Sequence, residues 1–329
     1  MVKLLDCTIR DGGYVNNWNF SKKFVEDLYN TLDKCSLDYI EIGFRNINAE
    51  YNDLSNIWRT CQEKDLSFIK KKKLKLSVMC DNSKFDINIF DDKSKSIIDM
   101  VRIAFHKDEI NNAITNCIKI KELNYDVCLN AMGTILYNDE ELFELCKGYL
   151  TTNCDYLYIA DSYGCMNTND ISRIKNKILK YCSEINPSKK IKLGFHAHNN
   201  LQNGIANVLY CINNEFDIID TTVMGMGRGS GNAPTEILLS NLNMNLYPII
   251  EFVNKHMKLK LIANKWGYNI PYFLSGHFKC HPTYITKLLE YGIIDYTMIW
   301  KIINIIVKNN KNNKFDKNYL DNIIKLNLK

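Results

Sequence analysis

The sequence predicts an α/β fold, a TIM (β/α)8 barrel followed by a C-terminal helical extension. Short, almost continuously apolar runs alternate with helix-length amphipathic segments from the first residues to about residue 245. Eight such runs occur, and runs of this kind are typical of parallel strands buried on both faces. A chain of 329 residues also has room for a barrel of about 250 residues and an appendage.

The predicted strands follow one another along the whole first part of the chain. In order they are Val2–Ile9, Tyr39–Phe44, Leu74–Cys80, Met100–Phe105, Asp126–Met132, Tyr156–Asp161, Lys192–His198 and Ile218–Gly225. Helical patterns lie between them, as at 21–35 and 168–185. We expect Ser21 to cap the first of these two helices and Thr168 or Asn169 to cap the second. A doubly wound parallel sheet is the alternative arrangement of the same elements.

The alternation stops after residue 245. The segments 246–266 and 300–310 have helical rather than strand-like apolar spacing. We therefore divide the chain into a barrel of residues 1–245 and a helical extension of residues 246–329, which we expect to contribute to the active-site mouth.

The composition argues against several classes of protein. No window approaches the roughly 18 apolar residues of a membrane span, and the N-terminus lacks the apolar run of a signal peptide, so we expect a cytoplasmic protein without membrane contact. The 12 cysteines are scattered without a C-x-x-C pair, which favours reduced, buried thiols over disulfides or structural zinc. The net charge of +5 comes from lysine-rich segments such as 70–73, which indicate a solvated surface rather than a nucleic-acid site.

Polar residues occur at the predicted carboxyl ends of the strands, where barrels collect catalytic groups. His196 and His198 are two residues apart on one predicted strand, so both imidazoles point to the same face. Asp11 follows the first strand, which lies close by in a closed barrel. Two imidazoles and a carboxylate suit an octahedral divalent cation such as Mn²⁺ or Mg²⁺, or a non-haem iron.

Four segments, "LDCTIRDGG", "YIEIGF", "GFHAHNN" and "GMGRGSGNAPTE", resemble in order and spacing the motifs of the DRE-TIM metallolyase superfamily. This superfamily has a hydroxymethylglutaryl-CoA lyase-like, or pyruvate carboxyltransferase-like, domain. The resemblance spans residues 2 to about 240 and is greatest to the 4-hydroxy-2-oxovalerate aldolase-like branch. It implies a divalent metal, Mn²⁺ or Mg²⁺, and chemistry through an enolate.

The resemblance also implies roles for individual residues. Asp11, His196 and His198 match the metal ligands, and Asn232 matches a residue near the metal. Arg10 matches the arginine that stabilises an enolate oxygen, and Glu41 a supporting glutamate. The residues expected to bind substrate are Gly12, Gly13, Asp161, Ser162, Gly227 and Gly229.

Simpler interpretations of some of these residues remain open. Arg10 and Asp11 also fit a surface ion pair, and Glu41 fits a structural partner of an arginine. The glycine loop fits a tight turn, or a backbone cradle for a carboxylate or phosphate.

The chain departs from the related enzymes at the proton-transfer group. Tyr14 stands where the aldolases have a histidine base, and an ordinary phenol is a weak base at neutral pH. Tyr284 and His281, with His277 nearby, are alternative proton-transfer groups from the extension, although the same segment fits a helix start with Pro282 in its first turn. The glycine loop lacks the reactive cysteine of hydroxymethylglutaryl-CoA lyases.

The predicted function is therefore that of a metal-dependent aldolase that acts on an α-keto acid and an aldehyde. A Claisen-type synthase that joins an acetyl-CoA enolate to an α-keto acid is the main alternative, and a non-catalytic metabolite-binding barrel is the second. The expected partners are these small molecules, with a second copy of the chain or an aldehyde-processing enzyme as protein partners.

Overall fold

The computed structural model describes residues 2–47, 57–257 and 266–327 and contains a closed barrel of eight parallel strands in sequence order. The strands are β1 (Lys3–Asp6), β2 (Tyr39–Phe44), β3 (Lys75–Asp81), β4 (Met100–Phe105), β5 (Asp126–Met132), β6 (Tyr156–Asp161), β7 (Leu193–Ala197) and β8 (Ile218–Thr221). β1 closes the barrel against β8, with Lys3 opposite Ile218 and Asp6 opposite Thr221. The closed ring confirms the TIM barrel and excludes the doubly wound sheet.

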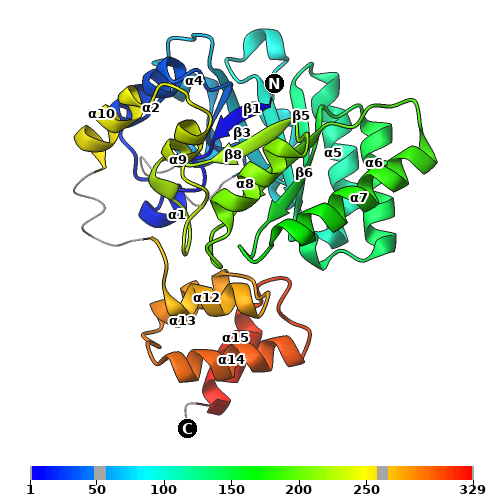
Figure 1. The fold of residues 1–329 in the computed structure, drawn as a ribbon, viewed down its shortest axis with the longest axis vertical. Coiled ribbons are helices and arrows are strands. Elements are labelled where there is room, and N and C mark those ends of the chain that lie inside the picture. Colours follow the sequence, from blue (N-terminus) through cyan, green and yellow to red (C-terminus); the bar gives the residue numbers. More distant parts are fainter. Residues whose placement is uncertain (1, 48–56, 258–265, 328–329) are drawn as a thin grey trace.

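Helices surround the barrel, and a smaller helical unit lies below it in Figure 1. The helices are α1 (Gly13–Asn16), α2 (Lys22–Lys34), α3 (Ile57–Thr60), α4 (Glu63–Leu66), α5 (Ile110–Glu122), α6 (Asp139–Thr152), α7 (Thr168–Ile185), α8 (Gly204–Asn213), α9 (Thr235–Asn241), α10 (Tyr247–His256), α12 (Ile270–His277), α13 (Thr283–Glu290), α14 (Tyr296–Lys308) and α15 (Lys317–Asn327). No helix among the described residues is long and apolar enough to cross a membrane.

The structure confirms one predicted helix cap and corrects the other. The Ser21 hydroxyl accepts a hydrogen bond from the N–H of Phe24 at the start of α2. The cap of α7 is Asn167 rather than Thr168 or Asn169. The Asn167 backbone is extended, with φ −116° and ψ 176°, and its side chain can therefore reach back to the free N–H groups of the first turn.

The expected alternation of strands and helices fails between β3 and β4. Residues 82–99 contain only three-residue 3₁₀ segments and no α-helix. Asp86 and Asp92 each accept a hydrogen bond from the N–H two residues later. Side chains that bond locally in this way favour turns over a continuous helix.

The extension divides into two parts by packing. Helix α10 packs on α2, with the rings of Phe24 and Phe252 at 5.1 Å, and it joins the hydrophobic core around the barrel. Helices α12 to α15 form a second hydrophobic core of their own, which includes Tyr284, Ile285, Leu288, Ile299, Ile302, Ile303 and Ile306. The helix expected over 246–266 ends at His256, and residues 258–265 lie outside the described part of the chain.

The barrel interior contains both apolar and charged side chains. Leu5, Tyr39 and Met100 belong to a small apolar cluster inside it.

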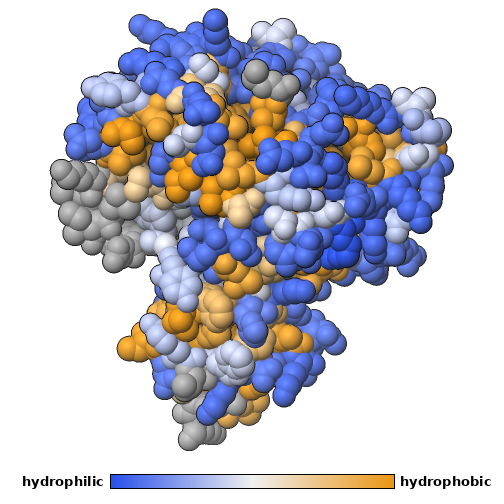
Figure 2. All heavy atoms as spheres, in the orientation of Figure 1, coloured by the Kyte–Doolittle hydropathy of each residue, from blue (hydrophilic) through white to orange (hydrophobic). Residues whose placement is uncertain are grey.

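All twelve cysteines are free, and all but Cys165 are buried, as the sequence predicts. Lysines 70–73 are exposed, and hydrophilic residues cover most of the molecular face in Figure 2, with apolar patches between the helices.

Candidate active site

Five of the predicted site residues lie at the mouth of the barrel, on the side that faces α12 and α13: Arg10, Asp11, His196, His198 and Asn232. Arg10 and Asp11 do not end a strand, because β1 stops at Asp6 and a series of turns brings them over the barrel. His196 lies on β7, and His198 follows it directly and forms an isolated β-bridge with Asn232. All five side chains are buried.

Asp11 and the two histidines form a compact cluster. The Oδ2 atom of Asp11 lies 3.2 Å from Nε2 of His196 and 3.4 Å from Nε2 of His198. One donor atom from each residue lies within 4.8 Å of the others. Three donors on two neighbouring segments, one after β1 and one at the end of β7, can therefore bind one ion.

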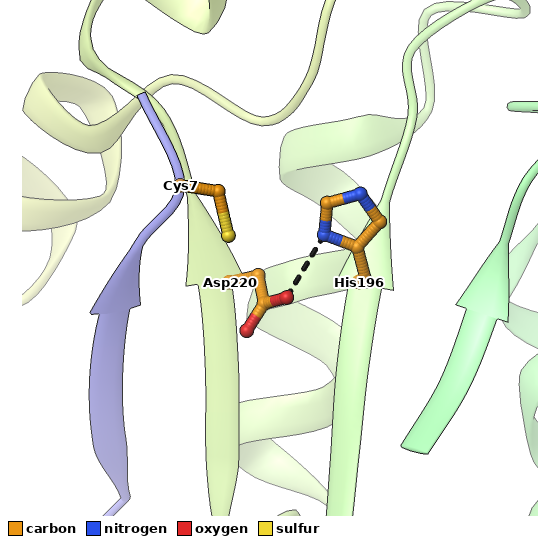
Figure 3. Close-up of side chains that lie close together, drawn as sticks. All are labelled: Cys7, His196 and Asp220. Atoms are coloured by element: carbon orange, nitrogen blue, oxygen red, sulfur yellow. Dashed lines mark hydrogen bonds and ion pairs between the residues drawn. The ribbon is translucent and has the colours of Figure 1, made fainter. Parts of the chain in front are cut away.

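The second nitrogen of each imidazole is fixed by a partner deeper in the fold. Nδ1 of His196 lies 2.9 Å from Oδ2 of Asp220 on β8 (Figure 3), and Nδ1 of His198 lies 3.0 Å from the carbonyl oxygen of Asp161. Such partners fix the tautomer of a metal-binding histidine and the direction of its ring. Both Nε2 atoms are thus left for Asp11 and an ion.

A chain of alternating charges supports this cluster from inside the barrel. Nε of Arg10 donates to Oε2 of Glu41 at 2.6 Å, and Nη1 of Arg10 lies 3.5 Å from Asp11. Arg102 on β4 pairs with Glu41 at 3.1 Å and also with Asp220. Arg10 and Asp11 are therefore not a surface ion pair, and Glu41 joins the two arginines.

The charges of this network hold its aspartates ionised. Burial alone would raise the pKa of Asp11, but Arg10 and His198 together keep that pKa well below its usual range. Burial of Asp220 is likewise outweighed by Arg102 and His196, which lower its pKa to about 2. Three carboxyl groups thus face two guanidinium groups, and this excess of negative charge suits a bound cation.

Oδ1 of Asn232 and Nη2 of Arg10 are among the buried polar atoms at the site that have no hydrogen-bond partner among the described residues. The Nδ2 atom of Asn232 donates to the carbonyl oxygen of Met226 at 3.3 Å, so its amide oxygen is free to contact an ion or a bound water. A carboxylate, two imidazoles and an amide oxygen are ligands typical of Mn²⁺ and other octahedral divalent ions. The residues therefore fit the group that the sequence predicts.

We expected Gly12 and Gly13 to bind substrate, but the space where a side chain would stand is filled by protein atoms at both glycines. A Cβ atom on Gly12 would lie 2.3 Å from the carbonyl oxygen of Thr8, and one on Gly13 would lie 2.1 Å from the indole of Trp18. The protein fills both spaces itself, and Nε1 of Trp18 donates to the carbonyl oxygen of Arg10 at 3.0 Å. These glycines allow the packing that fixes Arg10.

The two glycines of the loop after β8 that we expected to bind substrate, Gly227 and Gly229, have different neighbours. A Cβ atom on Gly227 would lie 2.2 Å from Nδ2 of Asn232 and 3.6 Å from Cγ of Asp11, so this glycine borders the metal-binding cluster. Gly229 has φ +70°, and a Cβ atom there would lie 2.6 Å from the ring of Tyr272 on α12. Its place is at the contact with the extension.

Asp161 and Ser162 shape the loops around the mouth. The Asp161 carboxylate accepts hydrogen bonds from the N–H groups of Cys165 and Met166, and burial raises its pKa to about 7. The Ser162 hydroxyl accepts one from the N–H of Gly133. Both side chains thus hold loops at the mouth, and their role in substrate binding stays a prediction.

The four candidates for the proton-transfer group lie in different surroundings. The Tyr14 ring lies at the mouth, and its pKa is raised to about 12 by desolvation and then by the Asp81 carboxylate. His281 lies with its ring 6.0 Å from that of His106, and its pKa is lowered well below its usual range by burial and then by Arg228.

The other two candidates lie inside the extension. The Tyr284 hydroxyl is in the second core, where it donates to the carbonyl oxygen of Lys311 and accepts from the N–H of Asp316. Its expected place at the mouth is therefore wrong, because the ring packs inward. His277 stacks between Phe273 and Trp300.

Sequence reasoning missed Arg102, Asp220 and Arg228. A signal for the first two was present, because a charged residue in the middle of an apolar strand buried on both faces needs a buried partner. Arg228 lies in the glycine loop, for which we considered only the backbone conformation and not the charged side chain.

Comparison with known proteins supports the family. The HMGL-like family model matches residues 1–264. The 4-hydroxy-2-oxovalerate aldolase of Geobacillus thermodenitrificans is 26% identical over 242 residues, which cover 73% of this chain and 69% of that enzyme. The enzyme of the same name from Carboxydothermus hydrogenoformans is 26% identical over 303 residues and is covered to 85%, as is this chain.

A solved structure extends the similarity to three dimensions. The N-terminal domain of a candidate aldolase from Bacteroides vulgatus has a TM-score of 0.75 and 29% sequence identity, and the match covers 88% of this chain and 97% of that one. Because the family model matches most of the sequence and the barrel is present, the chain belongs to the HMGL-like family of DRE-TIM carbon–carbon lyases and is an enzyme of that class.

Proposed function

We propose that the protein is a divalent-metal-dependent aldolase that makes or breaks a carbon–carbon bond next to the carbonyl group of a pyruvate-type α-keto acid. The observation that carries the proposal is the convergence of Asp11, His196 and His198 beside an arginine with an unpaired, buried nitrogen. The names of the related aldolases support the same activity.

The residues would act as follows. Asp11, His196 and His198, with the amide oxygen of Asn232, would hold the ion. A divalent ion in such a site acts as a Lewis acid on the carboxylate and carbonyl oxygens of the keto acid and orients them.

Arg10 contributes the positive charge of the protein itself. Glu41 anchors its Nε atom, and Nη2 is left to donate to the oxygen that becomes negative when the enolate forms. Because Glu41 and Trp18 fix the side chain and the backbone of Arg10 beforehand, the donor needs little reorganisation as the charge develops.

The balance of the reaction is that of an aldol. In the condensation direction, the methyl carbon of pyruvate loses a proton and forms a bond to the aldehyde carbon, and the aldehyde oxygen gains a proton. Cleavage of the 4-hydroxy-2-oxo acid is the reverse.

The test is the exchange of the pyruvate methyl protons for deuterium, followed by NMR. We expect exchange that a chelator abolishes and that Mn²⁺ or Mg²⁺ restores. Exchange at the full rate in metal-free protein would overturn the proposed metal dependence, and no exchange under any condition would support a non-catalytic barrel.

A second assay separates the aldolase from the Claisen-type synthase. We expect pyruvate release from a 4-hydroxy-2-oxo acid and no release of free thiol from acetyl-CoA with an α-keto acid. The opposite pair of results would favour the synthase.

A further inference from the structure

A cavity of about 660 Å³ lies between the mouth of the barrel and the extension. Tyr14 and Trp18 line it from the barrel, Arg228 from the glycine loop, and Trp266 and Tyr272 from the segment after the barrel. The lining residue Tyr14 lies beside the turn that contains Asp11, because its N–H donates to the carbonyl oxygen of Asp11 at 3.2 Å. The cavity therefore adjoins the place where a keto acid would bind.

Arg228 gives this cavity a positive charge. Its Nη1 atom donates to the Thr283 hydroxyl at 3.2 Å, and its guanidinium lies 5.0 Å from the centre of the Tyr14 ring. Its Nε atom is buried and has no hydrogen-bond partner within the described ranges.

The other charged groups that line the cavity, Lys287 and Glu290, form an ion pair with each other. No ion pair links Arg228 to a carboxylate in the part of the chain that the structure describes. One uncompensated positive charge thus faces the cavity.

The extension holds Arg228 in place. The carbonyl oxygen of Gly229 accepts a hydrogen bond from the N–H of Gly267 at 3.0 Å, and the Tyr272 ring packs directly on Gly229. Arg228 directly follows Gly227, which borders Asn232 and Asp11, and it contacts Thr283 of the extension, so it lies near the metal-binding cluster and the extension at once. The guanidinium is fixed before any ligand arrives.

We propose that this cavity binds the second substrate, the acceptor aldehyde, and that Arg228 selects an aldehyde that carries a carboxylate or a phosphate group. The inference rests on the proposed aldolase function and specifies its substrate class. The planar guanidinium pairs with two oxygens of an anion, and aromatic rings exclude water around the carbon chain. The anionic group takes no part in the bond that forms between the enolate carbon and the aldehyde carbon.

The test compares pairs of aldehydes that have the same number of carbon atoms but differ in charge, with pyruvate as the donor. Succinic semialdehyde is compared with butanal, and glyceraldehyde 3-phosphate with glyceraldehyde. We expect kcat/KM of the wild type to be roughly 10²-fold higher for the anionic member of one pair, as for a charge-assisted hydrogen bond. The pair that shows the preference identifies the anion as a carboxylate or a phosphate.

The variants assign this preference to Arg228. We expect Arg228→Gln to remove most of the preference and Arg228→Lys to keep part of it. Arg173→Gln, an exposed change on α7, is the matched control and should keep the wild-type ratio. Circular dichroism checks that each variant is folded, and the wild-type and Arg228→Lys ratios test the proposal even if Arg228→Gln does not fold.

An equal or inverted ratio in the wild type, or an unchanged ratio in folded Arg228→Gln, would overturn the inference. Exchange of the pyruvate methyl protons without any aldehyde distinguishes the two levels of the argument. Wild-type protein that exchanges these protons but does not prefer an anionic acceptor contradicts the acceptor assignment alone. Protein that does not exchange them contradicts the proposed function, and the assignment fails with it.

Discussion

At the scale of single residues, the site depends on the separation of two roles, ion binding and charge stabilisation. Asp11 and the two histidines offer donors to a cation, whereas Arg10 is held by Glu41 and keeps one nitrogen unpaired. The two roles can therefore be removed separately.

Arg10→Lys tests the charge-stabilising role. Lysine keeps the positive charge but loses the planar set of donors that contacts Glu41 and the substrate together. We expect kcat to fall roughly 10²-fold, as when an oxyanion donor is removed, with metal content unchanged. The measurements are steady-state kinetics and metal analysis of the same sample, and equal turnover would show that Arg10 is only structural.

Asp220→Asn tests the partner of His196. The amide keeps the shape, but it removes the negative charge that orients Nδ1 of His196 and pairs with Arg102. We expect metal affinity to fall about 10–100-fold. Metal titration measures it, and Asp139→Asn, on the exposed first turn of α6, is the control that should bind normally. Unchanged affinity in Asp220→Asn would exclude this orienting role.

At the scale of elements, α13 and the segment before it contribute His281 to the barrel mouth. The Tyr14 pKa of about 12 leaves very little phenolate to accept a proton at neutral pH. Burial and then Arg228 lower the pKa of His281, so its imidazole is a neutral acceptor that needs no prior loss of a proton. We expect His281→Ala to slow pyruvate deuterium exchange more than Tyr14→Phe does. The reverse order would assign proton transfer to Tyr14.

The contact between α2 and α10 is predicted to depend on pH. Burial would raise the pKa of Asp27, but Lys23, Lys255 and His256 outweigh it and keep that pKa below its unfolded value of about 3.9. The ionised carboxylate therefore stabilises the fold at neutral pH, and this contribution is lost as the pH falls below about 4. Urea unfolding should show a stability difference between wild type and Asp27→Asn at pH 7 that shrinks at pH 3. A difference that does not change with pH would contradict this prediction.

At the scale of the whole molecule, two hydrophobic cores meet across the mouth of the barrel. One surrounds the barrel and includes α10, and the other lies within α12 to α15. Hydrogen bonds such as that from Arg228 to Thr283 connect them. The extension therefore borders the active site from a separately packed unit.

Separate cores predict two transitions in calorimetric unfolding. Tyr284→Phe removes hydrogen bonds within the second core. We therefore expect it to lower the free energy of unfolding of the extension alone, by about 1–3 kcal/mol, and to shift only that transition to a lower temperature. Tyr29→Phe is the matched change near the barrel, where the Tyr29 hydroxyl donates to the carbonyl oxygen of Leu74. It should shift only the transition of the barrel to a lower temperature. A single transition shifted by both variants would show that the units unfold together.

The barrel and the pair of imidazoles could be predicted from local periodicity, since apolar runs specify strands and a spacing of two residues places both imidazoles on one face. The place of Asp11 beside them followed from closure of the barrel and from the family resemblance. The 3₁₀ segments between β3 and β4 were missed because local side-chain bonds there compete with a helix.

The residues that complete the site could not be predicted, because they come together only when distant segments pack. In the folded chain Tyr284 lies in the second core, and the protein's own atoms fill the space at Gly12 and Gly13. Arg102 joins Glu41 to Asp220. Arg228 contacts Thr283, which is 55 residues away in the chain. Contacts of this kind depend on how distant segments pack, and a residue's neighbours in sequence do not specify them.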